Sequence, residues 1–277
     1  MILTANQRIK MKDGASLFTM ACTVNTAIAN LIFLHGYTEH TGRYNWMFQK
    51  LNEANINVFA YDHRGFGKSD GERAYISDFD QYVEDMNAYV FSLNKPELPT
   101  FLMGHSMGSL IAVHYFISHS DHYFSGLISS SGALKIDEGI SPLLRKISGV
   151  MSKVAPHLKT IKLDSNALSR DQEEVVKYNI DPLVYHDGAK ARLGFEMLEA
   201  MKYAQENFYK IKLPVLILHG KADRLADPQG SQWMFDKISS SDKTISLFDG
   251  LYHEIMREPE KDQVMNAITD WIISRSA

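Results

Sequence analysis

The residues best suited to chemistry form the pattern GHSMG, from Gly104 to Gly108. A serine can act as a nucleophile when its hydroxyl is exposed on a sharp turn between a strand and a helix, and flanking glycines remove side chains that would collide there. The apolar run Phe101 to Met103 precedes the pattern, and a run long enough for a helix follows as far as Ser118. The pattern therefore indicates a nucleophilic Ser106, with an ordinary small-residue turn as the alternative.

His253 is the histidine best placed to serve as a base. A serine hydroxyl is a weak nucleophile near neutral pH and needs a base within hydrogen-bond reach. Among the eleven histidines, His253 follows an apolar run, Thr244 to Phe248, and the turn Asp249-Gly250 near the C-terminus. We predict that His253 takes the serine proton, and the alternative is an ordinary loop histidine.

Asp223 is the carboxylate expected to orient His253. It comes just after another apolar run, Pro214 to His219, where it can fix the imidazole tautomer and stabilise the imidazolium. Asp227 is the alternative, but it precedes a proline and is better explained as a helix N-cap. The resulting chain order Ser106, Asp223, His253 is that of the α/β-hydrolase triad, and differs from that of chymotrypsin or subtilisin.

An oxyanion hole requires two backbone N–H donors. Met107, the residue after the predicted nucleophile, supplies the first. The second is expected from the loop after the apolar run Leu31 to Leu34, where His35-Gly36 lead to Tyr37. We predict the N–H groups of Tyr37 and Met107 as the two donors, and the alternative for the loop is an ordinary glycine turn.

Apolar strands alternate with helices along most of the chain, which predicts a mostly parallel sheet with helices on both faces. Two antiparallel strands around Asp13-Gly14, within residues 7–24, should begin the fold. In such a sheet, ligands bind beyond the carboxyl ends of the strands. The predicted strands cover residues 31–34, 57–61, 101–103, 126–130, 214–219 and 244–248, and predicted helices cover 44–53, 77–93, the run up to 118, and 261–274.

The alternation lapses between about residues 132 and 209. We predict an α/β-hydrolase core formed by residues 1–132 and 210–277, and an inserted helical cap of residues 133–209. Ser141-Pro142 indicates a helix start, and apolar residues follow at helical spacing as far as Val154. Bases such as Lys135, Lys153 and Lys159 outnumber the acids here, so this helix either only packs over the core or also contacts an anionic membrane surface transiently.

Composition excludes several classes of protein. The 277 residues, 45% hydrophobic and 22% charged, suit one soluble domain, and a net charge of −4 gives no electrostatic basis for binding nucleic acid. The single cysteine, Cys22, excludes an internal disulfide framework and is expected in a strand. No secretory leader or membrane span is evident, so we expect a cytoplasmic protein, with peripheral association with membranes or lipid droplets as a further option. Serine chemistry needs no metal or organic cofactor, and the oligomeric state stays open.

Longer motifs extend the comparison beyond the fold. They are HGYTEHTGRY (35–44), YDHRGFGKSDGER (61–73), GHSMG (104–108), LSRD (168–171), YNIDPL (178–183), HGKADRLADP (219–228) and YHE (252–254). Together they resemble the monoglyceride lipases of the α/β-hydrolase superfamily. The resemblance runs from about Arg8 to Arg275 and includes the predicted cap, the segment that varies most between α/β hydrolases.

The resemblance implies a serine hydrolase that cleaves monoacylglycerol to glycerol and a fatty acid, with the acyl chain in an apolar tunnel beneath a mobile cap. It also implies contacts with the glycerol end of the substrate from Glu39, Arg43 and Tyr178, and the alternative for each is a structural ion pair or hydrogen bond. Where the mammalian pattern has a second histidine three residues after the catalytic one, this chain has Met256. The polar end of the pocket is therefore expected to differ.

Three alternatives remain open on the sequence. The same chemistry suits a lysophospholipid, a short soluble ester or an amide. A binding module on a hydrolase scaffold would recognise a ligand without turnover. Nucleotide binding at residues 65–69, which resemble the end of a P-loop, is disfavoured because Asp62 stands where that motif needs glycine.

Overall fold

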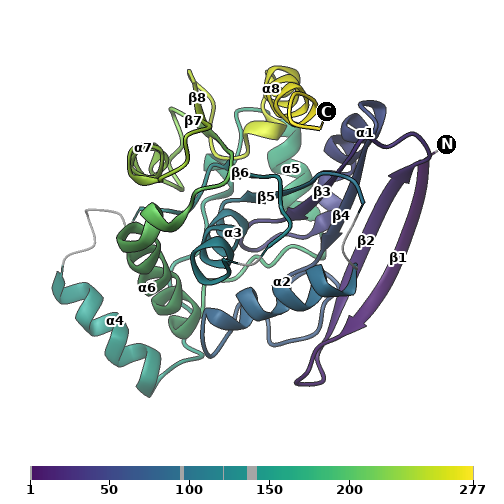
Figure 1. Ribbon diagram of the computed structural model, residues 1–277. Coiled ribbons are helices and arrows are strands. Elements are labelled where there is room, and N and C mark those ends of the chain that lie inside the picture. The colour runs from purple at the N-terminus through teal and green to yellow at the C-terminus, as the bar shows by residue number, and fades with distance from the viewer. Residues whose placement is uncertain (1, 94–96, 121, 136–141, 277) are drawn as a thin grey trace.

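The protein is built on one eight-stranded sheet (Figure 1). The computed structural model describes residues 2–93, 97–120, 122–135 and 142–276. The strands are β1 (Ile2–Lys10), β2 (Ser16–Val24), β3 (Ala29–Leu34), β4 (Ile56–Tyr61), β5 (Thr100–His105), β6 (Gly126–Ser130), β7 (Val215–Gly220) and β8 (Lys243–Phe248). The α-helices are α1 (Asn45–Glu53), α2 (Asp80–Ser92), α3 (Met107–Ser118), α4 (Pro142–Val154), α5 (Gln172–Ile180), α6 (Ala191–Asn207), α7 (Pro228–Lys237) and α8 (Lys261–Ile273).

The sheet is mostly parallel, as predicted. Its strand order is β1-β2-β4-β3-β5-β6-β7-β8. β2 pairs antiparallel with β1 and β4, and each pairing from β4 to β8 is parallel. The hairpin between β1 and β2 turns at Asp13-Gly14, where Gly14 has φ +92°, a conformation that glycine adopts without steric cost.

Helices cover both faces because the central strands are apolar on both sides. In β3, Ile32 and Leu34 belong to the core shared with α2, α3, α6 and α7. Leu31 and Phe33 belong to the core shared with α1 and α8. This alternation is the two-residue period of a strand. Figure 1 shows α1 and α8 on one side of the sheet and α2, α3 and α6 on the other.

The topology brings four loops to one edge of the sheet. β3 pairs in parallel with β5, with Leu34 opposite Gly104. β7 pairs in parallel with β8, with Gly220 opposite Phe248. The segments after these four strands carry the predicted triad, the two predicted oxyanion donors, Glu39 and Arg43, so these residues lie beyond the carboxyl ends of the strands, where open α/β sheets bind ligands. Tyr178, the remaining predicted site residue, lies on α5.

The described chain between β6 and β7 contains α4, α5 and α6. Leu193, Ala200 and Ala204 of α6 are buried in the core that also contains α3, and α4 packs on the far side of α6 from the sheet (Figure 1). The helix predicted from Ser141-Pro142 is α4, which begins at Pro142, and Ser141 lies outside the described residues. The division into a core of residues 1–132 and 210–277 and a cap of residues 133–209 stays a prediction.

Candidate active site

Ser106 lies in a strained turn between β5 and α3. Its φ of +53° and ψ of −115° belong to a region that residues other than glycine rarely adopt. The turn is held by a hydrogen bond from the Ser106 N–H to the carbonyl of Ser130 (3.0 Å). A Cβ added at Gly104 would lie 2.3 Å from the carbonyl oxygen of Gly108, and one added at Gly108 would lie 2.2 Å from that of Leu34. Both glycines are therefore required for the chain to pass here.

His253 and Asp223 form a buried hydrogen-bonded pair. His253 Nδ1 lies 2.7 Å from Asp223 Oδ2, and the two side chains are 5% and 0% exposed. Because an ionised carboxylate only accepts hydrogen bonds, Nδ1 carries the proton and Nε2 is left as an acceptor. Burial acts to lower the pKa of His253, but the Asp223 carboxylate outweighs burial and raises that pKa. Burial acts to raise the pKa of Asp223, but His253 and His219 hold it well below its usual range.

The residue before Ser106 packs against this pair. The ring of this residue, His105, is 4.9 Å, centroid to centroid, from the ring of His253. Across residues 2–93, 97–120, 122–135 and 142–276, no hydrogen bond engages the Oγ of Ser106 or the Nε2 of His253. Both atoms stay available, and hydrogen bonds between such groups often shorten only when a substrate binds.

The loop after β3 packs directly against Ser106. A Cβ at Gly36 would lie 3.3 Å from the Cβ of Ser106 and 2.7 Å from Glu39 Oε1, so a larger residue would push the loop away. The Gly36 N–H donates to Glu39 Oε1 (2.7 Å). In the described part of the chain, the N–H groups of Tyr37 and Met107 donate to no protein atom, which leaves both able to bind an oxyanion.

Within this loop, Thr38 has a left-handed backbone conformation. Its φ is +72°, which is a genuine outlier for a β-branched residue. α5 and the segment after it fix this conformation: the Tyr178 hydroxyl on α5 lies 2.7 Å from Thr38 Oγ1, and the Tyr185 N–H beyond α5 donates to the Thr38 carbonyl (2.8 Å). His40 Nε2 lies 2.9 Å from Asp181 Oδ2. Residues 178–185 of the predicted cap therefore hold the loop that carries Tyr37.

Arg43 lies between two buried carboxylates. Its Nη1 donates to Glu39 (2.7 Å) and Glu254 (2.7 Å), and its Nη2 donates to the second oxygen of Glu254 (3.0 Å). Its guanidinium lies over the Tyr178 ring, 4.7 Å from the centroid. Burial raises the pKa of Glu39 against the opposing charge of Arg43, whereas Arg43 and Arg257 outweigh burial and lower the pKa of Glu254. We call Glu39, Arg43, Tyr178 and Glu254 the Arg43 network.

The structure thus brings together the three residues expected at the glycerol end, Glu39, Arg43 and Tyr178. Their side chains are buried and contact each other or the loop of Tyr37. Sequence analysis missed Glu254, which completes this network, and His219, whose Nε2 lies 3.0 Å from Asp223 Oδ2. Both residues stand in the motifs 219–228 and 252–254, close to predicted catalytic residues, and this was the available signal.

Asp227, the alternative acid, has a structural role. Its Oδ1 accepts from the Gln229 N–H (2.9 Å), so it is the N-cap of α7, as predicted. Its Oδ2 also accepts from Lys135 Nζ (2.7 Å). Both Asp227 oxygens thus have structural partners, and the imidazole of His253 is paired with Asp223.

Met256, the departure from the mammalian pattern, is buried beside the Arg43 network. With Arg43, Tyr44, Glu174, Arg257 and others it lines a cavity of about 40 Å³. Among the described residues, no group of three or more His, Cys, Asp or Glu side chains is arranged to hold a metal ion. No helix in those same ranges is both long and apolar enough to cross a membrane.

A mostly parallel sheet with a strained serine after β5, and a histidine–aspartate pair after β8 and β7, defines an α/β hydrolase. Residues 25–260 match the family described as serine aminopeptidase, S33. The chain is 36% identical over 270 residues to the monoglyceride lipase of Rattus norvegicus, covering 96% of this chain and 89% of the relative. The chain belongs to the monoglyceride lipase family and is a carboxylic ester hydrolase.

Further relatives agree with this assignment. The monoacylglycerol lipase of Mycolicibacterium smegmatis is 35% identical over 246 residues, with 88% of each chain covered. The crystal structure of Paleococcus ferrophilus monoacylglycerol lipase superimposes with a TM-score of 0.82 and 30% identity over 99% of both chains. The similarity therefore extends over the predicted cap as well as the sheet.

Proposed function

We propose that this enzyme hydrolyses the ester bond of monoacylglycerols and releases a fatty acid and glycerol. Relatives from Rattus norvegicus and Mycolicibacterium smegmatis carry the name of that activity. The observation that carries the proposal is the 2.7 Å hydrogen bond between His253 and Asp223, at the edge of the sheet where the strained Ser106 lies. This arrangement suits a serine that is activated by a histidine.

In the first step, Ser106 Oγ attacks the ester carbonyl carbon and its proton passes to His253 Nε2. The oxyanion that forms accepts hydrogen bonds from the Tyr37 and Met107 N–H groups. Loss of one such donor typically slows the reaction by about a hundred- to a thousandfold. Asp223 keeps the Nδ1 proton in place and stabilises the imidazolium.

In the second step, the Nε2 proton of His253 moves to the glycerol oxygen as the ester C–O bond breaks. The acyl group is then bonded to Ser106 Oγ. Water attacks the acyl carbon and gives a proton to His253, and that proton returns to Ser106 Oγ as the fatty acid leaves. The residues named here carry out each transfer.

We place the glycerol end of the substrate beside the Arg43 network. Nη1 and Nη2 of Arg43 donate to Glu39 and Glu254, and its side chain is 5% exposed. We therefore assign Glu39, Arg43 and Tyr178 the role of holding the loop of Tyr37. Direct contact between these three residues and glycerol stays a prediction that rests on the family resemblance.

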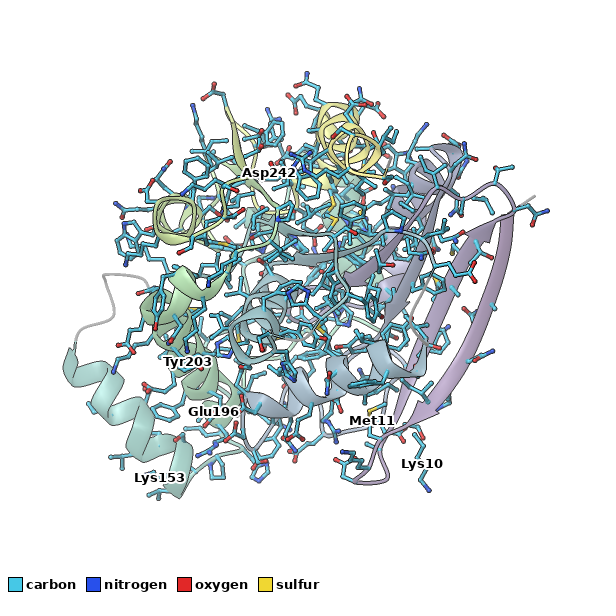
Figure 2. The ribbon with its side chains drawn as sticks, in the orientation of Figure 1. Lys10, Met11, Lys153, Glu196, Tyr203 and Asp242 are labelled. Carbon is cyan, nitrogen blue, oxygen red and sulfur yellow. The ribbon has the colours of Figure 1, made fainter. Side chains whose placement is uncertain are left out.

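The cap, residues 133–209, is proposed to cover the acyl chain and to contact lipid surfaces transiently. On α4, Ile147, Val150 and Val154 are 47%, 56% and 77% exposed, and Lys153 lies at the outer edge of the molecule (Figure 2). Lys135 takes no part, because it is buried against Asp227. An exposed apolar face with bases beside it suits an anionic interface. This supports peripheral association with membranes or lipid droplets, and the cytoplasmic location stays a prediction.

The proposal is tested by analysing products from mono-, di- and triacylglycerols and lysophospholipids of equal acyl length, with Ser106→Ala as the control. We expect monoacylglycerol to be preferred and the variant to be inactive. Each buried CH₂ contributes about 0.8 kcal/mol, so KM should fall with acyl length. Undiminished turnover by the variant would contradict the mechanism. Preference for lysophospholipid would change the substrate but keep the mechanism, and absence of turnover with every ester would favour a binding module.

A further inference from the structure

Asp223 receives more hydrogen bonds than a triad requires. Its Oδ1 accepts from the N–H groups of Leu225 (2.8 Å) and Ala226 (3.0 Å). Its Oδ2 is shared between His253 Nδ1 (2.7 Å) and His219 Nε2 (3.0 Å). The Asp223 side chain is 0% exposed, so water does not reach it. A second imidazole therefore competes with His253 for the same oxygen.

The contacts of His219 fix its tautomer. Nε2 faces two acceptors, Asp223 Oδ2 and the Ala226 carbonyl (3.1 Å), so Nε2 carries a proton. Nδ1 lies 2.7 Å from Ser231 Oγ, and the hydroxyl can donate to it. A neutral ring satisfies all three contacts, which suits a side chain that is 0% exposed.

We propose that His219 is a positioning residue for ester hydrolysis: its Nε2–H fixes Asp223 Oδ2 and limits how strongly that oxygen attracts the proton of His253. The inference rests on the proposed function, because His219 acts through Asp223 and His253. Two further contacts hold the His219 ring in place. Ser231 of α7 contacts Nδ1, and the carbonyl of Ala226, just before α7, contacts Nε2. They keep Nε2 within hydrogen-bond distance of Asp223.

The effect on His253 has a definite sign. The titratable groups around His253 are Asp223, His105, Glu254 and Glu39. Those around His219 are Asp223 and, more distantly, Asp227. Asp223 is common to both sets, so the loss of the His219 hydrogen bond reaches His253 through Asp223. A carboxylate that has lost one donor attracts its remaining partner more strongly, which raises the pKa of His253.

Two substitutions at position 219 separate the contacts. In His219→Asn the amide lies near the position of Nδ1, so it keeps the Ser231 contact and loses the one with Asp223. In His219→Gln the amide nitrogen lies near the position of Nε2, so it keeps a donor to Asp223. We expect kcat of the Asn variant to fall about tenfold, while KM changes by no more than about twofold. The acid limb of its kcat/KM profile should move to higher pH by about half a unit. In the Gln variant, the acid limb of kcat/KM should lie at the same pH as in the unsubstituted enzyme.

His114→Asn is the matched control for removing a buried histidine. His114 is 4% exposed and its Nε2 lies 2.9 Å from the Ala200 carbonyl, away from Asp223. The His114→Asn substitution should lower the melting temperature without moving the acid limb of kcat/KM. An unmoved limb in a folded His219→Asn enzyme would overturn the inference, and so would equal shifts in the Asn and Gln variants.

A measurement on the unsubstituted enzyme does not depend on any variant folding. Nitrogen-15 NMR of the histidine rings should show His219 protonated at Nε2, and protonation at Nδ1 alone would overturn the inference. Failure of the proposed function is distinguishable from both results, since it would appear as undiminished activity of Ser106→Ala, as preference for lysophospholipid or as absence of turnover with every ester.

Discussion

At the scale of single residues, Gly108 shows how little room surrounds Ser106. A Cβ there would lie 2.2 Å from the Leu34 carbonyl oxygen, which belongs to the backbone of β3 and cannot move alone. We expect Gly108→Ala to lower the free energy of unfolding by about 1 to 3 kcal/mol. Displacing Ser106 by about 1 Å should lower kcat/KM by about a hundredfold. Urea unfolding and ester hydrolysis measure the two effects.

Gly194 provides the matched control. It lies within α6, and a Cβ there would meet no atom within 4 Å. Gly194→Ala should raise the free energy of unfolding by up to about 1 kcal/mol, because alanine has the higher helix propensity, and should leave kcat/KM unchanged. Similar losses in both alanine variants would show that packing at Gly108 is not specific to the site.

The pH dependence of activity follows from the His253 pair. His253 must be neutral to accept the serine proton, and Asp223 raises its pKa. The acid limb of kcat/KM should therefore lie above the ordinary histidine value of about 6.5. Asp223→Asn removes the cause, so the limb should move to lower pH while the rate falls by about 10⁴-fold, as in comparable triads. The measurement is kcat/KM from pH 5 to 9.

Asp227→Asn separates the two candidate acids. Asparagine is also a good N-cap, so α7 should be preserved. Because Asp227 caps α7 and pairs with Lys135, its substitution should leave the acid limb in place. If the acid limb of kcat/KM moved in Asp227→Asn but not in Asp223→Asn, Asp227 would be the acid that orients His253.

At the scale of elements, residues 178–185 connect the predicted cap to the loop of Tyr37. Tyr178→Phe removes the hydroxyl that contacts Thr38 and keeps the ring under Arg43. A strained loop that loses a fixing contact should populate other conformations. We expect kcat to fall about tenfold with KM little changed, measured on a short soluble ester so that lipid binding does not enter.

Tyr185→Phe is the control for this prediction. Its hydroxyl contacts the Gly188 carbonyl (3.2 Å), while its backbone N–H, which holds Thr38, is retained. This variant should keep nearly full activity. Equal losses in both phenylalanine variants would place the effect in general cap stability and contradict a specific role for the Thr38 contact.

The exposed face of α4 is the second element with a testable role. Ile147→Ser with Val150→Ser removes apolar groups that are 47% and 56% exposed, so the fold should tolerate the change. Sedimentation with vesicles of equal phosphatidylglycerol and phosphatidylcholine should show binding weakened by at least about tenfold. Hydrolysis of a short soluble ester should be unchanged. Undiminished vesicle binding would exclude this face as the contact.

Periodicity and position allowed most elements to be predicted. β3 is buried throughout, and its four apolar residues in sequence indicated a strand of a parallel sheet. The glycines at 104 and 108 predicted the turn at Ser106, and the proline after Asp227 predicted the N-cap of α7. Each of these patterns lies within a few consecutive residues, so the local sequence is enough to predict the strand, the turn and the N-cap.

At the scale of the whole molecule, contacts between distant segments could not be predicted from local patterns. Arg43 and Glu254 are separated by 211 positions, and only the completed sheet brings them together. Lys135 was grouped with the exposed bases of the cap, yet it is buried against Asp227. The left-handed Thr38 was also unpredictable, because tertiary contacts hold a threonine where local preference opposes it.

The Arg43 network makes stability depend on pH. The pKa of Glu254 is lowered to about 2 in the folded protein, because Arg43 and Arg257 outweigh burial. The stabilisation is therefore fully present above the unfolded pKa of about 4.3 and is lost as pH falls from there through the folded pKa. Glu254→Gln leaves Arg43 short of one charge partner and should lower the free energy of unfolding by about 2 to 4 kcal/mol at pH 7. Urea unfolding should show this difference narrowing as pH falls from about 5 to about 2, the pKa of Glu254 in the folded protein. A difference that stayed constant would contradict the ion pair.

The central claim is that Ser106 is reactive because His253 and Asp223 lie beside it. The most direct test is the rate at which a fluorophosphonate modifies the protein, with the modified residue located by peptide mass spectrometry. The account predicts an adduct on Ser106 alone, formed at a rate that follows the ionisation of His253 and falls at least about a thousandfold in His253→Ala. Modification of another serine, or an unchanged rate at Ser106 without His253, would contradict it.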